Sequence, residues 1–424
     1  MAGSYYPKTA FTRWLDSRLP IVRLVNETFV GFPVPKNLNL WYTFGGILTV
    51  MLGVQLVTGI VLAMHYVPNA DLAFSSVEGR IMREVNYGWL IRYLHACGAS
   101  MFFLAVYVHL ARSLYYGSYK APREVLWILG VVLYYLMVAT AFVGYVLPWG
   151  QTSFWGATVI TNLFTAFDQV VPHFGTAITT WLRGDFAVGD ATLNRFFSLH
   201  YLLPFAMIAV VVLHIWALHV TGNGNPLGID VRGPQDTLPF HPYYTIRDLL
   251  YLALFLIVFA AVVFYAPNLF LSPDNYVRAD PLSTPGEIVP EWYLLPFYAM
   301  LRAVPQKLIG VLVLFAALAS LLFVPWLDRS NVRSCRFRPL MQQFFWLFLA
   351  DCLFLGYCGA QASDAAITVV GVDLPLVWFA RLATLYYFAF FWVVMPWLGK
   401  IEVTRPLPAG IAEAVLKKTR GDRL

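Results

Sequence analysis

The chain has 424 residues, of which 59% are hydrophobic and only 12% are charged, and its formal net charge is +6. The charged share is about half that of an ordinary soluble protein, so the composition excludes a soluble globular fold. The basic excess gathers in the two terminal segments and in alternate loops, as membrane topology requires. We therefore expect a membrane protein, and no nucleic-acid partner is needed to explain the charge.

Uncharged apolar stretches of about 20 residues recur along the chain, and each is long enough to cross a bilayer as an α-helix. The sequence therefore predicts an all-α membrane protein with eight transmembrane helices. We place the spans at 41–65, 89–111, 124–147, 197–217, 248–266, 308–326, 341–358 and 376–397.

The chain begins with "MAGSYYPKTAFTRWLDSR", which has no continuous apolar core before a small-residue cleavage site, so we expect no cleavable signal peptide. With eight spans, both termini lie on the same side of the membrane. Lysine and arginine are concentrated on that side, in the termini and in the loops after spans two, four and six. The positive-inside rule then places segment 1–40 and the basic tail 401–424 in the cytoplasm.

Two loops on the opposite side, 148–196 and 267–307, are long and contain apolar, aromatic and proline-rich patches. We expect short helices that lie at the membrane face in these loops. Residues 218–247 form a polar loop on the cytoplasmic side. The predicted organisation is a four-helix bundle over 41–217, span five with its loop over 248–307, and spans six to eight over 308–400.

Four histidines lie inside the predicted spans, where ionisable groups are rare and usually functional. His95 and His109 are fourteen residues apart in span two, and His200 and His214 are fourteen apart in span four. Fourteen residues rise about 21 Å and turn about 1400°, which leaves both histidines of a span on one helix face. Because spans two and four run in the same direction, His95 is level with His200, and His109 with His214.

Each level pair offers two imidazoles, and this count favours one kind of cofactor. A structural zinc ion needs four ligands, whereas iron in a porphyrin needs only two axial ligands. We therefore expect two non-covalent b-type haems, each held by one pair. A zinc site or a proton relay is the weaker alternative, and a single histidine could simply bond to a neighbouring helix.

Glycines repeat the same interval in the two other spans of the bundle. Gly45 and Gly59 lie in span one, and Gly130 and Gly144 lie in span three, again fourteen residues apart. Glycine weakens a helix unless something must approach the backbone closely, and a flat macrocycle is such a group. The alternative is the ordinary packing of small residues between membrane helices.

Two arginines flank the histidines of span two at helical spacing. Arg92 precedes His95 by three residues, and Arg112 follows His109 by three. Arginine binds carboxylates in a bidentate manner, so both residues suit haem propionates. They could also be interfacial anchors whose apolar stems lie along the membrane.

With the paired histidines, the motifs "GYVLPWGQTSFWGATVITNL" (144–163) and "PEWY" (290–293) closely resemble the cytochrome b family of ubiquinol–cytochrome c oxidoreductase, respiratory complex III, over about residues 25–400. The resemblance implies a low-potential outer haem on His95 and His200 and a high-potential inner haem on His109 and His214. It also implies that ubiquinol is oxidised at an outer site, that electrons pass through both haems to reduce quinone at an inner site, and that the cycle contributes to proton translocation.

For the outer site, the resemblance makes Glu291 of "PEWY" the partner of the hydroquinone and the acceptor of its proton. A carboxyl in an apolar pocket has a raised pKa and can relay a proton near neutrality. The alternative is a carboxylate at a helix start, stabilised by the helix dipole. The resemblance implies the rest of this site as Tyr145, Tyr293, Phe142, Gly156 and Ile288.

For the inner site, the resemblance implies that His219 and Asp248 bind the quinone carbonyls and pass protons, with Asn223 and Arg247 beside them. Asn223 and Arg247 stand where mitochondrial members often have serine and lysine. The alternatives are a histidine that meets the dipole at a helix end and an aspartate that caps span five.

The same resemblance implies the partners: a Rieske iron–sulfur protein, a cytochrome c-type subunit, ubiquinone, membrane lipid and a second copy of the chain. The continuous chain and its basic tail favour a bacterial inner-membrane protein. The alternative function is a di-haem membrane anchor of another quinone-linked oxidoreductase, which would lack "PEWY". A transporter is a further rival, but it would need no paired axial ligands.

Overall fold

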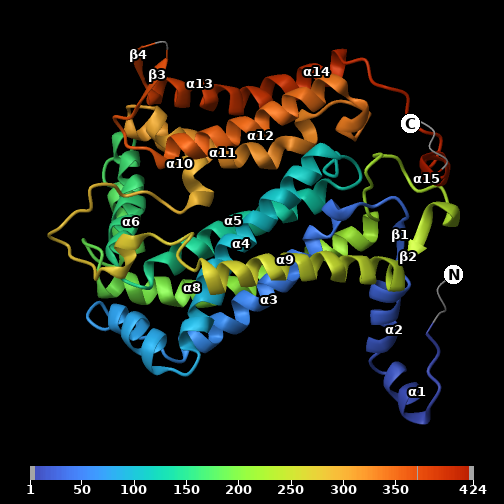
Figure 1. Cartoon of the computed structure of the whole chain (residues 1–424), viewed down its shortest axis with the longest axis horizontal. Coiled ribbons are helices and arrows are strands. Elements are labelled where there is room, and N and C mark those ends of the chain that lie inside the picture. Colours follow the sequence, from blue (N-terminus) through green and yellow to red (C-terminus); the bar gives the residue numbers. More distant parts are fainter. Residues whose placement is uncertain (1–4, 370, 420–424) are drawn as a thin grey trace.

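The computed structural model describes residues 5–369 and 371–419 and is built almost entirely of helices (Figure 1). Among the described residues, eight helices are long and apolar enough to cross a membrane, which confirms the predicted number of spans. Their bounds are α3 (Phe44–Ala63), α4 (Gly88–Tyr115), α5 (Glu124–Val146), α8 (Asp190–Thr221), α9 (Thr245–Tyr265), α11 (Lys307–Leu327), α12 (Pro339–Ala360) and α13 (Leu376–Ala389), the last continued by η10 (Phe390–Val394) and α14 (Met395–Ile401).

The largest difference from the predicted spans lies at the start of the fourth. Helix α8 begins at Asp190, seven residues before the predicted position 197. Its first turns are polar, and an aspartate in the first turn is favourable beside the positive end of the helix dipole. The apolar stretch therefore marks the membrane-buried part of the helix and not its beginning.

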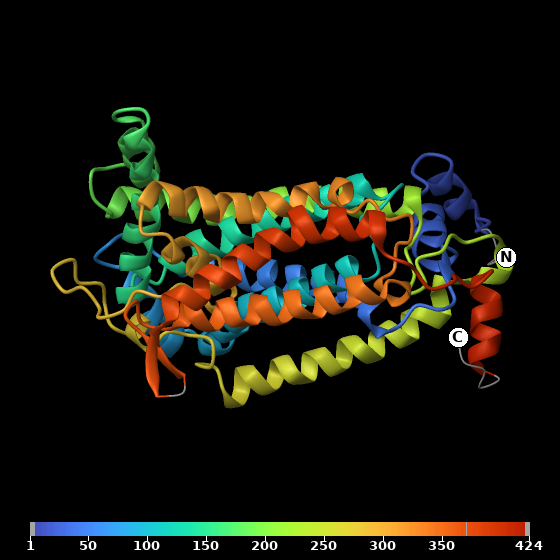
Figure 2. The same ribbon diagram turned by 90° about the horizontal axis from the view of Figure 1, so that it is seen from above.

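The spans form two groups that lie against each other. Helix α3 packs against α4, and α5 packs against α8, while α10 (Leu295–Ala303) to α13 pack mainly on one another. Figures 1 and 2 show α11 to α14 running alongside the first group. The largest cluster of buried apolar side chains draws on α3, α4 and α5 as well as α10 to α14, so the two groups share one core.

Both long loops contain short helices, but not all of them lie at the surface as expected. In the first loop, α6 (Gln151–Asn162) runs across the end of the bundle, followed by η4 (Leu163–Gln169) and α7 (Phe174–Arg183) (Figure 1). In the second loop, α10 is buried against α11, α12 and α13 instead of lying at the surface. Small residues permit this close packing: Ala299 and Ala303 are buried, and a Cβ on Gly359 of α12 would overlap the carbonyl of Leu295.

Short elements complete the fold. Strand β1 (Pro33–Pro35) pairs antiparallel with β2 (Thr237–Pro239), which ties the N-terminal segment to the loop before α9. Strands β3 (Ala366–Val369) and β4 (Val372–Pro375) form an antiparallel hairpin at the opposite end. The remaining elements are α1 (Ala10–Asp16), α2 (Ile21–Val25), η1 (Asn26–Val30), η2 (Leu40–Tyr42), η3 (Ser75–Glu84), η5 (Pro234–Asp236), η6 (Phe240–Tyr244), η7 (Pro273–Tyr276), η8 (Trp292–Leu294), η9 (Cys335–Phe337) and α15 (Ile411–Thr419).

A buried ion cluster joins the two helix groups at the end that holds both termini. Asp328, directly after α11, accepts bonds from Lys120 Nζ at 2.9 Å, Arg338 Nη1 at 2.8 Å and the Tyr119 hydroxyl at 2.6 Å. Arg338 Nε also lies 3.1 Å from Glu402. Burial alone would raise the pKa of the Asp328 carboxyl, but the Lys120 and Arg338 cations hold that pKa below its usual range. The carboxylate is therefore charged at neutral pH and connects the loop after α4 with the C-terminal helices.

We expect Asp328→Asn to lower the free energy of unfolding by about 3 kcal/mol or more, because it leaves the buried Lys120 without a counter-charge and Arg338 with Glu402 alone. Thermal unfolding of the purified protein measures this loss. The control is Asp71→Asn, which removes the exposed partner of Arg278 at the other end of the molecule and should cost about 1 kcal/mol or less. Equal melting temperatures for the two variants would contradict the role of the buried cluster.

Candidate functional site

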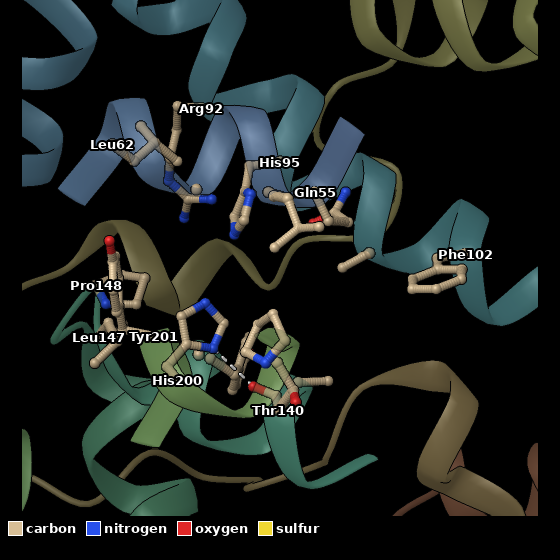
Figure 3. Close-up of a pocket in the computed structure, with 18 of the residues that line it drawn as sticks. Gln55, Leu62, Arg92, His95, Phe102, Thr140, Leu147, Pro148, His200 and Tyr201 are labelled. Carbon is tan, nitrogen blue, oxygen red and sulfur yellow. Dashed lines mark hydrogen bonds between the residues drawn. The ribbon is translucent and has the colours of Figure 1, made fainter. Parts of the chain in front are cut away.

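The outer pair of histidines faces across the space between α4 and α8. The ring centroids of His95 and His200 are 6.0 Å apart, and the ring planes are close to perpendicular at 84°. Figure 3 shows the two rings pointing toward each other across a cavity, with the Arg92 side chain pointing into the same space. The structure thus brings together two residues that are 105 positions apart in the sequence.

The inner pair meets in the same way, fourteen residues further along both helices. The ring centroids of His109 and His214 are 6.5 Å apart, with 57° between the ring planes. A single helix pair, α4 and α8, therefore supplies two imidazole pairs at two depths of the bundle. This arrangement follows from the equal spacing within each helix and from their shared direction.

Hydrogen bonds at Nδ1 fix the tautomer of the outer pair. His200 Nδ1 lies 2.9 Å from the carbonyl oxygen of Thr140, which can only accept, so Nδ1 carries the proton. His95 Nδ1 lies 2.9 Å from the Thr58 hydroxyl, which donates its own proton to the carbonyl of Val54. In both rings the free lone pair is therefore on Nε2, the nitrogen that a metal would take. The sequence analysis did not identify Thr58 and Thr140.

The inner pair has different neighbours. Arg112 Nη2, a donor, lies 3.2 Å from His109 Nδ1, and the Arg112 guanidinium also lies over the ring of Tyr42 at 4.5 Å. Arg112 Nε is buried without a hydrogen-bond partner. A buried guanidinium with an unpaired donor is suited to an anionic group between the helices, since arginine binds carboxylates in a bidentate manner.

The separation of the rings matches two axial imidazoles on one metal. A metal–imidazole bond of about 2.0 Å places each ring centroid roughly 3.1 Å from the metal, so two such rings have centroids about 6.2 Å apart. The observed separations are 6.0 and 6.5 Å. Within the described part of the chain, no group of three or more His, Cys, Asp or Glu side chains could hold a metal ion. The geometry therefore fits a macrocycle that needs two protein ligands, and not a four-ligand zinc site.

The four glycines of the fourteen-residue pattern lie against these histidines. A Cβ added to Gly59 would be 3.1 Å from Cε1 of His95, and one on Gly144 would overlap the ring of His200. At the inner pair, Gly45 faces His109 at 3.5 Å and Gly130 faces His214 at 3.2 Å. The glycines thus make room for the imidazole rings themselves, a closer contact than the one expected with a flat cofactor.

Glu291 lies beside the outer pair. It occupies the N-cap position of the short helix η8, where its side chain makes no capping hydrogen bond. Together with Tyr145 it lines both the cavity around His95 and His200 and a second cavity that opens toward the loop 267–307. Burial raises the pKa of the Glu291 carboxyl to about 7, and a hydrogen bond from Tyr145 and the Arg92 cation oppose that rise. The Tyr145 hydroxyl is also bonded to Thr152 at 3.1 Å.

Of the other residues expected at the outer site, only some line the cavities beside Glu291. Tyr293 lines the first cavity and stacks on Phe103, with ring centroids 3.7 Å apart. Phe142 packs on Phe196 of α8 and lines neither of the two cavities. Gly156 on α6 has open space beside it, and the carbonyl of Ile288 accepts a bond from Tyr298. Tyr293 is therefore brought to Glu291, whereas Phe142, Gly156 and Ile288 lie outside both linings.

The residues expected at the inner site contact the N-terminal segment and the start of α3. His219 Nε2 lies 3.2 Å from the carbonyl of Thr28, and its ring packs on Phe32 at 4.4 Å. Asp248 accepts a bond from the Thr43 hydroxyl at 2.8 Å. The sequence analysis treated segment 1–40 as a terminal extension and did not single out its Thr28 and Phe32, nor Thr43 in the first span.

Arg247 and Asn223, the two residues expected beside His219 and Asp248, make other polar contacts. Arg247 donates to the carbonyl of Leu38, lies over the ring of Tyr244 at 4.3 Å and has its Nε buried without a partner. The carbonyl of Asn223 faces Arg123 Nη2 at 3.4 Å. The side chains of Arg247 and Asp248 touch at 3.5 Å, so they form one polar group beside the N-terminal segment.

Fold and site together describe a multi-pass helical membrane protein with two histidine pairs between two of its spans. The family model for "Cytochrome b/b6/petB" matches residues 29–222, and the model for "Cytochrome b(C-terminal)/b6/petD" matches residues 278–388. The chain therefore belongs to the cytochrome b family, and the resemblance found in the motifs is confirmed.

Individual relatives agree with this assignment. A cytochrome b of Rhodospirillum rubrum is 57% identical over 95% of this chain and 96% of its own length, and one of Rhodobacter capsulatus is 53% identical over 96% of each. A cytochrome b/c1 of Bradyrhizobium diazoefficiens is 56% identical over 98% of this chain, which spans 58% of that longer protein. A chain of a hyperthermophilic respiratory complex III superposes with a TM-score of 0.84, at 36% identity over 92% of this chain and 99% of its own.

The predicted class of function is confirmed with the family. The chain is the cytochrome b type of core subunit of a quinol–cytochrome c oxidoreductase, an electron-transport protein that crosses the membrane several times and acts with other subunits. Membership of the family implies haem as the cofactor.

The glycine contacts generate a graded prediction. We expect Gly144→Ala to push the His200 ring aside and to lower the b-type haem absorbance of the purified protein, because the new methyl group would overlap that ring. Gly45→Ala should have little effect, since 3.5 Å is an ordinary van der Waals distance. A reduced-minus-oxidised spectrum, normalised to protein, measures both.

The matched control is Gly53→Ala in α3, where nothing lies within 4 Å of the added atom. Its spectrum should equal that of the unaltered protein. If Gly144→Ala also gave an unaltered spectrum, this result would show that haem binding does not require the His200 ring in the position seen in the structure.

Proposed function

We propose that His95 and His200 hold one b-type haem and that His109 and His214 hold a second. The observation that carries this proposal is the pair of centroid separations, 6.0 and 6.5 Å, at two levels of the same two helices. A bound haem would supply a one-electron carrier at each level. The chain would contribute the neutral imidazoles, and the hydrogen bonds of His95 and His200 support their role as Nε2 ligands.

We propose that the protein lies in a bacterial inner membrane. The end of the bundle that holds both termini would face the cytoplasm. The support is the concentration of lysine and arginine at that end. In this orientation His95 and His200 are the outer pair, and Glu291 lies toward the outer face. The bacterial origin of the relatives named above supports the choice of membrane.

At the outer site, Glu291 would accept a proton from ubiquinol. Oxidation of a quinol releases two protons, and a general base is most effective when its pKa is near the working pH. The raised pKa of Glu291, about 7, meets this requirement. The cavity that Glu291 shares with Tyr145 leads toward the loop 267–307, which gives the proton a path outward. Tyr293, stacked on Phe103, would form a wall of the site.

At the inner site, His219 and Asp248 would bind quinone and supply the two protons that its reduction consumes. Asp248 is held by Thr43 and lies beside Arg247, which can keep its charge balanced. The nearby N-terminal segment contributes Thr28 and Phe32 to the surroundings of His219. Oxidation of quinol outside and reduction of quinone inside would together move protons outward.

The partners that we propose are a Rieske iron–sulfur protein and a cytochrome c-type subunit as electron acceptors, with ubiquinone as the substrate and a homodimer as the assembly. The relative named cytochrome b/c1 and the complex III neighbour support an assembly of this kind. A di-haem anchor of another oxidoreductase is the weaker candidate, because the second family model covers the C-terminal helices as well as "PEWY".

For the outer site, we expect Glu291→Gln to slow quinol oxidation by the assembled complex on the order of 100-fold, because the amide cannot accept the proton. In the unaltered protein the rate should rise with pH until the carboxyl is deprotonated, near pH 7, and then level off. The variant should lose this dependence while its haem spectrum stays unchanged.

Glu287→Gln is the control for that experiment, since this exposed carboxylate lines the same outer cavity four residues earlier. It should change the rate far less. A Glu291→Gln complex with an unaltered rate and pH profile would remove the proposed role of the carboxyl.

For the inner pair, we expect His214→Leu to remove one of two haems, because leucine offers no ligand to the metal. Quinol should still reduce the outer haem in an assembled complex. A difference spectrum with quinol as the reductant measures this, and His241→Gln, an exposed histidine at the same end, is the control. Loss of the outer haem alone would contradict the assignment of the pairs.

A further inference from the structure

The N-terminal helices form an arm that projects from the bundle. We call residues 8–25, which contain α1 and α2, the interfacial arm. Neither of these two fully described helices has a buried residue. Seven large apolar side chains of the arm are exposed by 42 to 66%, and they are Phe11, Trp14, Leu19, Ile21, Val22, Leu24 and Val25.

Such an arm is not stable in water by itself. Helices α1 and α2 have seven and five residues, and isolated helices shorter than about 12 residues are marginal in water. The main packing partners of the arm are its own two helices and the adjacent η1. Exposed apolar side chains gathered in one short segment indicate an interaction site. Something outside the chain must therefore cover the arm.

The direction of the arm indicates that the surface of the membrane covers its exposed apolar side chains. Figure 1 shows α2 running across the direction of the spans at the end that holds both termini, with α1 reaching past the neighbouring span α9. An element that runs across the spans at their ends lies in the plane of the membrane face. The arm thus extends sideways, away from the bundle, at the level where the lipid headgroups begin.

The side chains of the arm fit that level. Trp14 stacks on Phe11 with centroids 6.1 Å apart, and aromatic side chains of this kind are enriched at membrane–water interfaces. The Arg18 guanidinium lies 5.1 Å from the centroid of the Trp14 ring, so a cation is held beside the apolar face. This combination of aromatic and basic residues is the signature of an interfacial helix.

The positive charges of the arm favour lipids with anionic headgroups. Arg23 is paired with Asp16, and this bond closes the turn between α1 and α2. The other cations, Lys8, Arg13 and Arg18, have no carboxylate partner within the described residues. Their hydrogen bonds go to neutral oxygens of Lys8, Trp14 and Ser17. Three uncompensated cations beside an apolar surface complement the phosphate groups of anionic lipids.

We infer that the interfacial arm is a lipid-binding element that lies on the membrane leaflet at the end with both termini and binds the headgroups of anionic phospholipids. The aromatic side chains would enter the headgroup region, and Lys8, Arg13 and Arg18 would contact phosphates. This inference needs the membrane spans but does not depend on the haem or quinone assignments.

The test uses the complete complex with a single thiol-reactive fluorophore at Phe11→Cys, reconstituted into vesicles whose lipids carry bromine near the headgroup. The vesicles are made of phosphatidylcholine alone or with phosphatidylglycerol at a ratio of two to one. Unaltered complex treated with the fluorophore corrects for the native cysteines, of which Cys97, Cys335 and Cys358 are buried. We expect strong quenching in the anionic vesicles, and a loss of quenching as salt is added.

The variant Arg13→Gln/Arg18→Gln, made in the labelled background, removes two of the three cations. At about 1 kcal/mol for each basic residue, the ratio of docked to undocked arm should fall about 30-fold, so quenching should be lost at lower salt. Arg232→Gln/Arg405→Gln removes the same charge from exposed positions at the same end and should leave the salt midpoint unchanged. The haem spectrum of each variant establishes that the complex is intact.

Two results would overturn the inference. Equal quenching in both kinds of vesicle, unchanged by the arginine substitutions, would show that the arm does not recognise anionic headgroups. A label that remains accessible to a water-soluble quencher and insensitive to brominated lipid would show that the arm lies off the membrane. Cross-linking of the same cysteine to a second copy or to another subunit would then identify what covers it.

Discussion

The rest of the structure depends on the contact of two imidazoles across the space between α4 and α8. The rings of His95 and His200, and of His109 and His214, can face each other only if the two helices run in the same direction and keep equal spacing. The neighbouring helices make this possible, because α3 and α5 present glycine where each ring must pack. The four helices thus provide both the facing imidazoles and the space that their rings occupy.

Polar side chains surround the histidine pairs and continue toward both ends of the bundle. Thr58 and Thr140 take up Nδ1 of the outer histidines and leave Nε2 free. Glu291 lies beside the same cavity, with a pKa raised by burial to about 7. At the other end, His219 lies against Thr28 of the N-terminal segment, and Asp248 accepts a bond from Thr43 at the start of α3. Imidazole pairs and titratable side chains therefore follow one another from one end of the bundle to the other.

Much of this could be predicted from the sequence, and the failures have physical reasons. Charge-free stretches define the eight spans, but α8 begins seven residues earlier because a helix continues beyond the membrane. Phe142 was expected at the outer site; it packs on Phe196 and lines neither of the two cavities, so its place there stays a prediction. The role of Thr58 could not be seen, since a threonine within a span usually bonds to its own helix, and which span packs beside it depends on tertiary structure.

The most direct test of the central claim is the amount of haem iron in the purified complex, measured for each copy of this chain after correction for the iron of other subunits. Two b-type haems for each chain, both low-spin with two imidazole ligands by electron paramagnetic resonance, are the result that the paired histidines predict. One haem for each chain, or a spectrum without bis-imidazole ligation, would contradict the account.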